Sequence, residues 1–330
     1  MTCYRMTPAI ARGIAALACV WCATLHAQPA WKPEKNVEII VPAAPGAAFD
    51  TTGRTLQRLL QDQKMLAGTS SVINKAGGGG TIAMSYLNQH AGDGHYLFVM
   101  TASVLTNNIL GVSKDTYTDF TPLAMLFSEY LAYGVRAESP IKNARDLVEA
   151  LRKDPSRYSI AVATSRGGAL HIATGMALKA AGVDVKKLRV VVFNANAESM
   201  TAMLGGHVDV AVSTVNSFVP HAQSGKLRVI AVSSPRRLKG FADAPTWKEQ
   251  GVNSEYASWR GVMGPRGLSA AQTAYWEDVF GKLTRTDEWR QDVEKNLWEV
   301  TYKGSRDTMK EMAEHNEQLR KILVELELAK

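Results

Sequence analysis

The sequence predicts an α/β fold, because short apolar runs rich in β-branched residues alternate with stretches of helical periodicity along most of its 330 residues. Residues 36–41 are typical of a first strand and residues 50–63 of an amphipathic helix. Four consecutive glycines at 77–80 follow a second strand-like run, 70–74. A loop without side chains lets the backbone approach a ligand and direct N–H groups at it. The pattern therefore favours a binding site.

The same alternation continues toward the C-terminus. A helix is expected at 81–89, a buried strand at 96–100 and an extended apolar segment at 123–135. A second series is then expected, in this order: helix 144–153, strand 158–163, helix 169–181, strand 189–193, helix 196–204, strand 208–212, helix 217–224, strand 229–232 and a charged helix at 305–328.

Ligands of open α/β sheets bind beyond the carboxyl ends of the strands. These ends carry five loops rich in Gly, Ala, Ser, Thr and Asn, at 45–49, 77–80, 164–168, 194–196 and 213–216. The loops offer backbone N–H groups and neutral hydroxyl and amide groups, but almost no general acids, bases or nucleophiles. This composition suits the binding of a ligand better than catalysis.

The N-terminus is typical of an export signal over residues 1–27. Two arginines precede an apolar core, 14–22, that is too short to cross a bilayer, and a cleavage site follows at Ala27. An ordinary first helix and a lipoprotein signal at Cys19 are the alternatives. All three cysteines lie in this segment, so the mature chain would hold no disulfide and no thiol nucleophile, and its net charge would fall from +7 to +5.

The composition argues against several functions. No basic block or aromatic-interleaved stripe indicates nucleic-acid binding, and no later segment is apolar enough to cross a membrane. The seven histidines form no metal-spaced pair, and there is no Gly-x-Ser-x-Gly elbow or phosphate-binding Gly-Lys-[Ser/Thr]. We therefore expect a soluble periplasmic protein that is no enzyme and uses no metal or cofactor.

Eight segments occur in order between Trp31 and the C-terminal helix: Val41-Pro-Ala-Ala-Pro-Gly-Ala-Ala-Phe-Asp50 with Arg54, Asn74-Lys-Ala-Gly-Gly-Gly-Gly-Thr81, Gly92-Asp-Gly-His-Tyr-Leu97, Asp119-Phe-Thr-Pro122, Leu204-Gly-Gly-His-Val-Asp209, Gly225-Lys-Leu-Arg228, Asp243-Ala-Pro-Thr246 with Glu249 and Gly251, and Trp259-Arg-Gly261 with Pro265. Each is a weak signal alone. Together and in this order they resemble the periplasmic solute-binding proteins of tripartite tricarboxylate transporters, the Bug or TctC family.

The resemblance implies a type II-like periplasmic binding protein with two lobes, each a mixed sheet flanked by helices, and a ligand cleft between them. Lobe 1 would hold 28–130 and 235–330, and lobe 2 would hold 131–234. A monomer would close around a small organic anion and deliver it to membrane permease subunits. A sensor that reports to a kinase is an alternative, and a cleft enzyme is a weaker one. The expected ligand-binding residues are Gly46, Ala47, Ala48, Phe49, Asp50, Gly79, Gly80, Thr81, Thr164, Ser165, Gly167, Gly168, His171, Asn196, Ser213 and Thr214.

Several of these positions leave a second role open. Asp50 can cap a helix or contact the ligand, and His171 can hold a loop by a hydrogen bond or contact the ligand. Phe49 can pack within its lobe or stack on the ligand. It stands where the family more often has a small polar residue, which favours an aromatic or otherwise less polar carboxylate. Gly79→Val is expected to reduce ligand affinity with little loss of folding.

Overall fold

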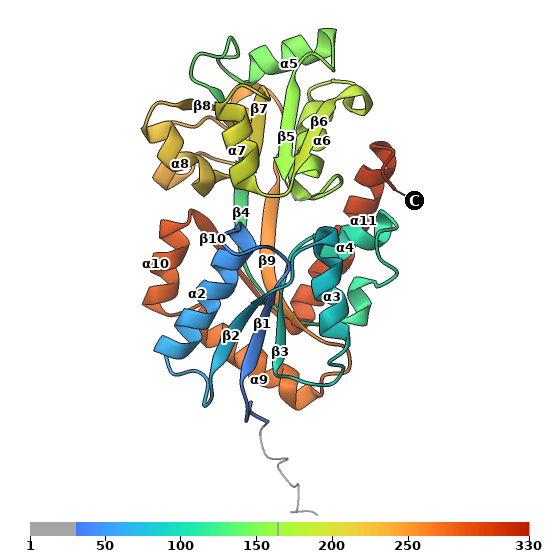
Figure 1. Cartoon of the computed structure of the whole chain (residues 1–330), viewed down its shortest axis with the longest axis vertical. Helices are drawn as coiled ribbons and strands as arrows, with labels where there is room; N and C mark the ends of the chain where they lie inside the picture. Colours follow the sequence, from blue (N-terminus) through green and yellow to red (C-terminus); the bar gives the residue numbers. More distant parts are fainter. Residues whose placement is uncertain (1–30, 164, 330) are drawn as a thin grey trace, which may run out of the picture. The chain divides into compact units, whose positions relative to one another are not determined.

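The computed structural model describes residues 31–163 and 165–329, and the residues from Pro33 onward form one compact unit. The expected signal segment, 1–27, lies outside the described residues. The unit is α/β, as predicted, with a mixed sheet flanked by helices (Figure 1).

Parallel strands and helices alternate in the first part of the unit. Its elements are β1 (Val37–Val41), α2 (Ala48–Asp62), β2 (Ser70–Asn74), α3 (Thr81–Asn88), β3 (Tyr96–Met100) and α4 (Ser103–Ile109). β1 lies between β2 and β3 and pairs in parallel with both, with Val41 opposite Asn74 and Ile40 opposite Phe98. The loops that follow these strands therefore meet at one edge of the sheet.

The long strand β4 (Thr121–Arg136) confirms the extended segment predicted at 123–135. Four other strands pair with it in antiparallel fashion: β7 (Val210–Thr214), β8 (Leu227–Val232), β9 (Ala257–Gly264) and β10 (Trp298–Gly304). Up to Tyr130 its partners are β9 and β10, and from Leu131 they are β7 and β8. β4 thus belongs to two groups of strands, and Figure 1 shows it running from one group to the other.

The second group is built around β5 (Ser159–Ala163), which pairs in parallel with β6 (Arg189–Phe193) and β7. The helices of this part are α5 (Ala144–Lys153), α6 (Ala169–Ala180), α7 (Asn196–Leu204) and α8 (Val215–Gln223). The alternation of strands and helices predicted here is confirmed. α8 begins two residues before its predicted start, and Pro220 lies within it.

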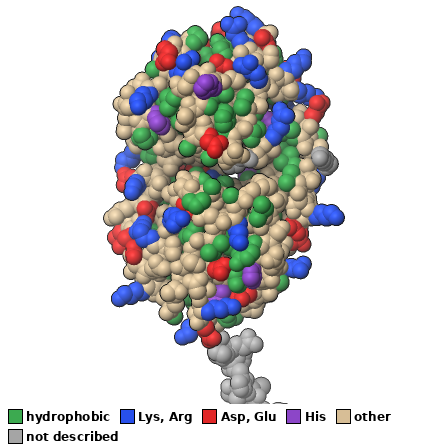
Figure 2. Space-filling model, viewed as in Figure 1, with side chains coloured by type: hydrophobic (Ala, Val, Ile, Leu, Met, Phe, Trp, Pro, Cys, Tyr) green, Lys and Arg blue, Asp and Glu red, His purple; other side chains and the backbone are tan. Residues whose placement is uncertain are grey.

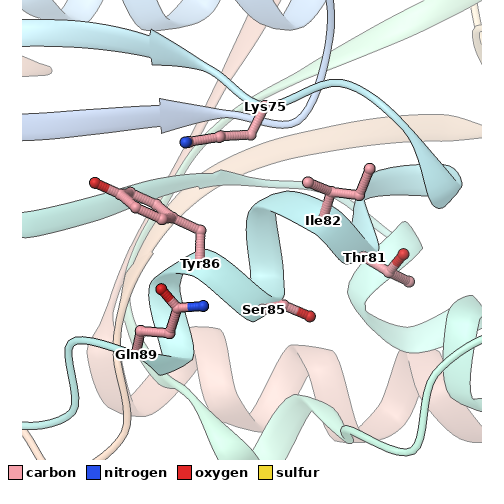
Figure 3. A pocket seen from close by; sticks show the side chains of 6 residues that line it. All are labelled: Lys75, Thr81, Ile82, Ser85, Tyr86 and Gln89. Atoms are coloured by element: carbon pink, nitrogen blue, oxygen red, sulfur yellow. The ribbon is translucent and has the colours of Figure 1, made fainter.

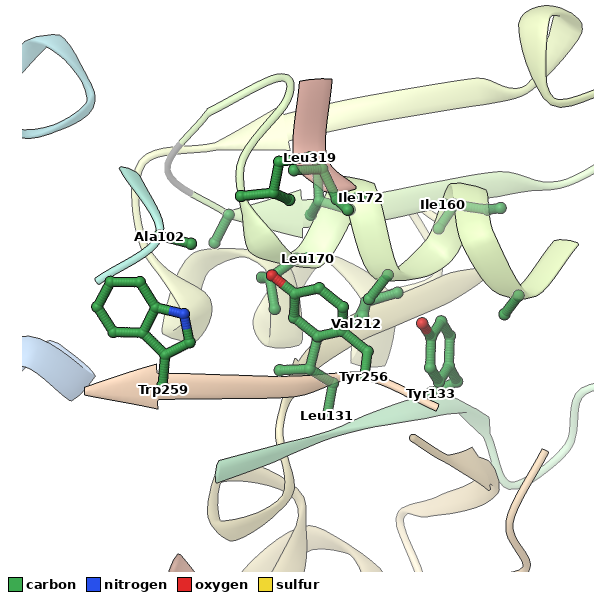
Figure 4. Close-up of a cluster of buried hydrophobic side chains, with 14 of the residues drawn as sticks. Ala102, Leu131, Tyr133, Ile160, Leu170, Ile172, Val212, Tyr256, Trp259 and Leu319 are labelled. Carbon is green, nitrogen blue, oxygen red and sulfur yellow. The ribbon is translucent and has the colours of Figure 1, made fainter. Parts of the chain in front are cut away.

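The C-terminal part adds three helices: α9 (Ala270–Leu283), α10 (Asp287–Lys295) and α11 (Ser305–Glu325). The sequence predicted only the last of these, and it also missed α4, β9 and β10. One buried apolar core contains side chains of both strand groups, including Phe98 from the first group and Tyr133 from the second, and a second cluster around Phe218 packs within the second group. Figure 4 shows part of this core, where Tyr133 and Tyr256 lie close to α6.

Candidate ligand-binding site

The loop after β1 is held by the buried carboxylate of Asp50, in the first turn of α2. Its Oδ2 accepts hydrogen bonds from the Gly46 amide and Arg54 Nε, both at 2.8 Å, and its Oδ1 accepts one from Asn74 Nδ2 at 2.9 Å. Burial alone would raise the pKa of Asp50, but these three donors together hold it below its usual value. Both oxygens are therefore occupied in holding the loop, and a ligand contact of Asp50 stays a prediction.

The glycine run forms the turn that leads into α3. All four glycines at 77–80 have positive φ, a region that non-glycine side chains rarely adopt. The Gly79 carbonyl accepts a hydrogen bond from Asn107 Nδ2 on α4 at 3.1 Å, and a Cβ on Gly80 would lie 3.3 Å from Pro42 Cβ. The run therefore packs between the end of β1 and α4. Because Gly79 has a φ of 64°, the expectation that Gly79→Val spares folding is wrong.

Asn74 joins these two loops at the end of β2. Besides Asp50, its Nδ2 donates to the Ala43 carbonyl at 3.0 Å. The structure thus brings together eight of the predicted site residues at the ends of β1 and β2, two of them, Gly46 and Ala47, in the loop between β1 and α2. The eight residues are Gly46, Ala47, Ala48, Phe49, Asp50, Gly79, Gly80 and Thr81.

The loop before α6 is held by His171. The Nδ1 atom of His171 accepts a hydrogen bond from the Gly167 amide at 2.9 Å. Burial, with a smaller effect of the Arg166 charge, lowers the pKa of His171 to about 4, so the ring is neutral near pH 7. His171 therefore holds the loop by a hydrogen bond, which is one of the two roles left open by the sequence. Its contact with a ligand stays a prediction.

The same loop approaches α4. A Cβ on Gly167 would lie 2.7 Å from Leu110 Cδ1, and the Gly168 amide donates to the Ser165 carbonyl at 3.3 Å. α4 therefore contacts the glycine run through Asn107, and Leu110, the residue that follows α4, contacts the loop before α6. Thr164, predicted for the site, lies outside the described residues.

The remaining predicted residues lie on β7 and α7. Ser213 and Thr214 end β7 beside the point where β4 changes partners, with Thr214 opposite Leu131. The Thr214 hydroxyl donates to Asn216 Oδ1 at 2.6 Å, and Asn196 is the first residue of α7. Among the described residues, no hydrogen bond links these three positions with the loops after β1 and β2.

A buried arginine on β9 was missed as a site residue, although Trp259-Arg-Gly261 was noted as a family segment. Arg260 is only 5% exposed and forms an ion pair with Glu129 of β4, which is 4% exposed. Burial raises the pKa of Glu129, and the Arg260 charge opposes that shift. The sequence did contain a signal for this pair. Glu129 and Arg260 each stand within an apolar strand, and buried charges need partners.

Arg260 lies where the strands of the first group end. Its Nη1 donates to Ser258 Oγ at 2.8 Å, to the Trp259 carbonyl at 3.1 Å and, at 3.4 Å, to the hydroxyl of Thr101, the residue after β3. The guanidinium carbon lies 4.5 Å from the centre of the Phe49 ring. Arg260 therefore connects the end of β3 with the first turn of α2.

A shallow pocket of about 360 Å³ lies on the outer side of α3 and shares only Thr81 with the predicted site. Lys75 lies over the Tyr86 ring in this pocket, 4.2 Å from its centre (Figure 3). The Tyr86 hydroxyl donates to Glu38 at 2.8 Å, and this bond raises the pKa of Tyr86 to about 12. Figure 2 shows a hollow across the middle of one face, with basic and acidic side chains interspersed around it.

The described residues also bear on membranes and metals. No helix among residues 31–329, Thr164 aside, is long and apolar enough to span a membrane. Within the same described residues, no three histidine, cysteine or carboxylate side chains are grouped as metal ligands would be.

Curated proteins and solved structures resemble this chain over most of its length. A protein from Cupriavidus necator, named "UPF0065 protein in gbd 5'region", is 25% identical over 299 residues, which cover 90% of this chain and 89% of that protein. The structure of the periplasmic binding protein BugD is 24% identical with a TM-score of 0.80, and covers 90% of this chain and 99% of its own.

Two Rhodopseudomonas palustris structures contain carboxylates. Rpa4515 with adipate is 22% identical with a TM-score of 0.81, over 90% of this chain and 99% of that one. MatC with bound malate is 21% identical with a TM-score of 0.73, over 90% of this chain and all of that one. At these identities the likeness establishes the fold.

The family follows from a match to the sequence model described as "Tripartite tricarboxylate transporter family receptor", which covers residues 54–328. The predicted family is thereby confirmed, and so is the prediction that the protein binds a solute and is no enzyme. The chain belongs to the receptors of the tripartite tricarboxylate transporter family.

Proposed function

We propose that this protein is a periplasmic receptor that captures a small organic carboxylate and delivers it to a tripartite transporter. The observation that carries the proposal is the meeting of two side-chain-poor loops at the ends of β1 and β2, each leading into a helix N-terminus. Helix N-termini and free backbone N–H groups favour an anion. Adipate and malate in two solved relatives of the same fold support a carboxylate.

Neutral donors are sufficient for such a ligand. A micromolar dissociation constant needs about −8 kcal/mol. Hydrogen bonds to a charged group contribute about 1.5–3 kcal/mol each, so a few of them with some apolar burial reach this value. The carboxylate beside the first loop, that of Asp50 in α2, does not repel the ligand strongly because Arg54 pairs with it at 2.8 Å.

The proposed cleft lies between two lobes. One lobe holds residues 28–130 and 235–330, and the other holds residues 131–234. The change of β4 partners between Tyr130 and Leu131 supports the first boundary. Near the second boundary, between residues 234 and 235, the Ser233 amide donates to the Leu131 carbonyl at 2.8 Å. The chain therefore lies beside β4 again where it would leave lobe 2. Closure of two such parts around a ligand would exclude water and strengthen each hydrogen bond to its charge.

Calorimetric titration of the purified protein tests the ligand class. The panel is adipate, malate, fumarate, succinate, benzoate and terephthalate, and the control is adipamide, which has the shape of adipate without its charges. At least one carboxylate is expected to bind with a micromolar dissociation constant and adipamide at least a hundredfold more weakly. The proposal fails when no carboxylate binds, or when the diamide binds as tightly as its acid.

We also propose that residues 1–27 direct export to the periplasm. The protein recovered from the periplasmic fraction of a Gram-negative host should begin at Gln28. An intact Met1 on the recovered protein, or recovery from the cytoplasm alone, contradicts this. The expectation of a monomer stays a prediction, which sedimentation of the same sample tests.

A further inference from the structure

The Arg260 guanidinium is fixed on several sides by its own protein. Glu129 pairs with its Nη2, and its Nη1 donates to three oxygens, including the Thr101 hydroxyl. With 5% of its surface exposed, it is neither mobile nor free to act as the main charge that attracts an anion. Its planar group is instead available for stacking.

The stacking partner is Phe49. The guanidinium carbon lies 4.5 Å from the ring centre, within the range of a cation–π contact. Phe49 itself is half-buried and lies in the first turn of α2, next to Ala48. Because Arg260 is almost fully buried and lies against one face of the ring, that face is covered and the exposed part of Phe49 lies away from it. Phe49 is thus held on one side by Arg260 and stays partly exposed elsewhere.

We propose that Arg260 is a positioning residue which holds Phe49 as an aromatic wall of the ligand site, so that the site selects carboxylates with a flat, unsaturated body. This rests on the proposed function, since it assumes that a carboxylate binds beside the loops after β1 and β2. A fixed ring presents a π face without losing rotamer freedom on binding. Flat π systems stack on such a face, whereas puckered rings and flexible chains of the same size contact it less completely.

Matched ligand pairs test the selection. Benzoate is compared with cyclohexanecarboxylate, terephthalate with cyclohexane-1,4-dicarboxylate, and fumarate with succinate, by calorimetry on the full mature chain. The flat member is expected to bind roughly three- to tenfold more tightly in at least one pair, the range of an aromatic contact beyond area burial. Phe49→Leu should abolish this ratio, Phe49→Tyr should keep it, and Phe241→Leu, a half-buried ring elsewhere, should leave it unchanged.

Arg260→Lys separates positioning from stability. Lysine keeps a positive charge near Glu129 but lacks the planar group, so the ratio should fall toward one while the melting temperature records any general loss of folding. A folded Arg260→Lys protein with the wild-type ratio overturns the positioning role. Equal binding of flat and saturated members in every pair overturns the selection and leaves the receptor function standing. No binding of any carboxylate overturns the receptor function itself.

Discussion

The Ser233 hydroxyl donates a hydrogen bond to the Tyr256 carbonyl oxygen across 2.6 Å. The same hydroxyl oxygen accepts a hydrogen bond from the Leu131 amide at 2.9 Å, and Ser233 is only 2% exposed. One side chain therefore joins three segments: the start of the second half of β4, the chain that leaves β8 and the chain that enters β9.

We expect Ser233→Ala to lower the free energy of unfolding by about 2 kcal/mol, because a buried donor and a buried acceptor each lose a partner. Urea denaturation measures this. Ser234→Ala is the matched control, since that equally buried hydroxyl donates only to the nearby Arg236 carbonyl at 2.7 Å. Its loss should be about half as large, and equal losses for the two variants would contradict the linking role of Ser233.

His171 should make the protein less stable in mild acid. Its pKa is about 4 in the folded protein and about 6.5 in the unfolded chain, so below pH 6.5 the unfolded state binds more protons. The contribution to stability is complete above pH 6.5 and declines by about 3 kcal/mol as the pH falls to 4. Asp93, with a pKa of about 2, titrates below this window.

His171→Asn tests this dependence, because an asparagine oxygen can accept the Gly167 amide without titrating. Unfolding free energies at pH 7 and pH 4.5 should differ less in the variant than in the wild type. Burial also lowers the pKa of His315, which accepts from Trp259 Nε1 at 2.7 Å, so a smaller acid loss should remain. His207→Asn, at an exposed position, is the control, and an unchanged acid loss in His171→Asn would refute the assignment.

Local patterns predicted the parts of the fold that depend on local chemistry. The apolar run of β4 and the alternating strands and helices of the second group follow from periodicity within a few residues. α4 was missed because it is short and has two asparagines and a threonine among its seven residues. β9 was missed because Arg260 interrupts its apolar run, and the charge is acceptable there only through Glu129, which is 131 positions away in sequence.

The same distinction between local and distant residues applies to the candidate site. The bare loops and their place at strand ends were visible in the sequence, since Gly and strand-end patterns are local. The partners that occupy Asp50 were not, because Asn74 lies 24 residues further along the chain. Sequence spacing alone therefore located the loops but left open which of their polar groups are already engaged.

The end of α11 packs onto α6 at a glycine. A Cβ on Gly175 would lie 3.0 Å from Leu326 Cδ2 and 3.1 Å from Leu326 Cδ1. Glycine inside a helix costs up to about 1 kcal/mol relative to alanine, so the absence of a side chain here serves this contact. Near the same point Lys179 of α6 forms an ion pair with Glu325.

We expect Leu326→Ala to destabilise the protein by about 2 kcal/mol, and Gly175→Ala to be more favourable in the Leu326→Ala background than in the wild type. In the wild type the added methyl crowds Leu326, whereas in the variant it fills part of the space and restores helix propensity. A double-mutant cycle of unfolding free energies measures the coupling. A coupling of zero would mean that Gly175 and Leu326 do not constrain one another.

The glycine run needs a test that separates strain from ligand contact. Gly79 has φ 64° and ψ 23°, a left-handed conformation in which a β-branched residue costs roughly 1–2 kcal/mol or more. Gly79→Val would therefore lower stability and affinity together. Asparagine tolerates this conformation, so Gly79→Asn adds a side chain to the loop with less strain.

We expect Gly79→Asn to weaken binding at least tenfold for the tightest carboxylate of the calorimetric panel, with less than about 1 kcal/mol lost in the free energy of unfolding. Gly225→Asn is the matched control, because Gly225 has a φ of 69° and a Cβ there would meet nothing within 4 Å. The control should pay a similar conformational cost and keep wild-type affinity. Wild-type affinity in Gly79→Asn would place the glycine run outside the ligand site, and an equal loss in both variants would assign the effect to backbone strain.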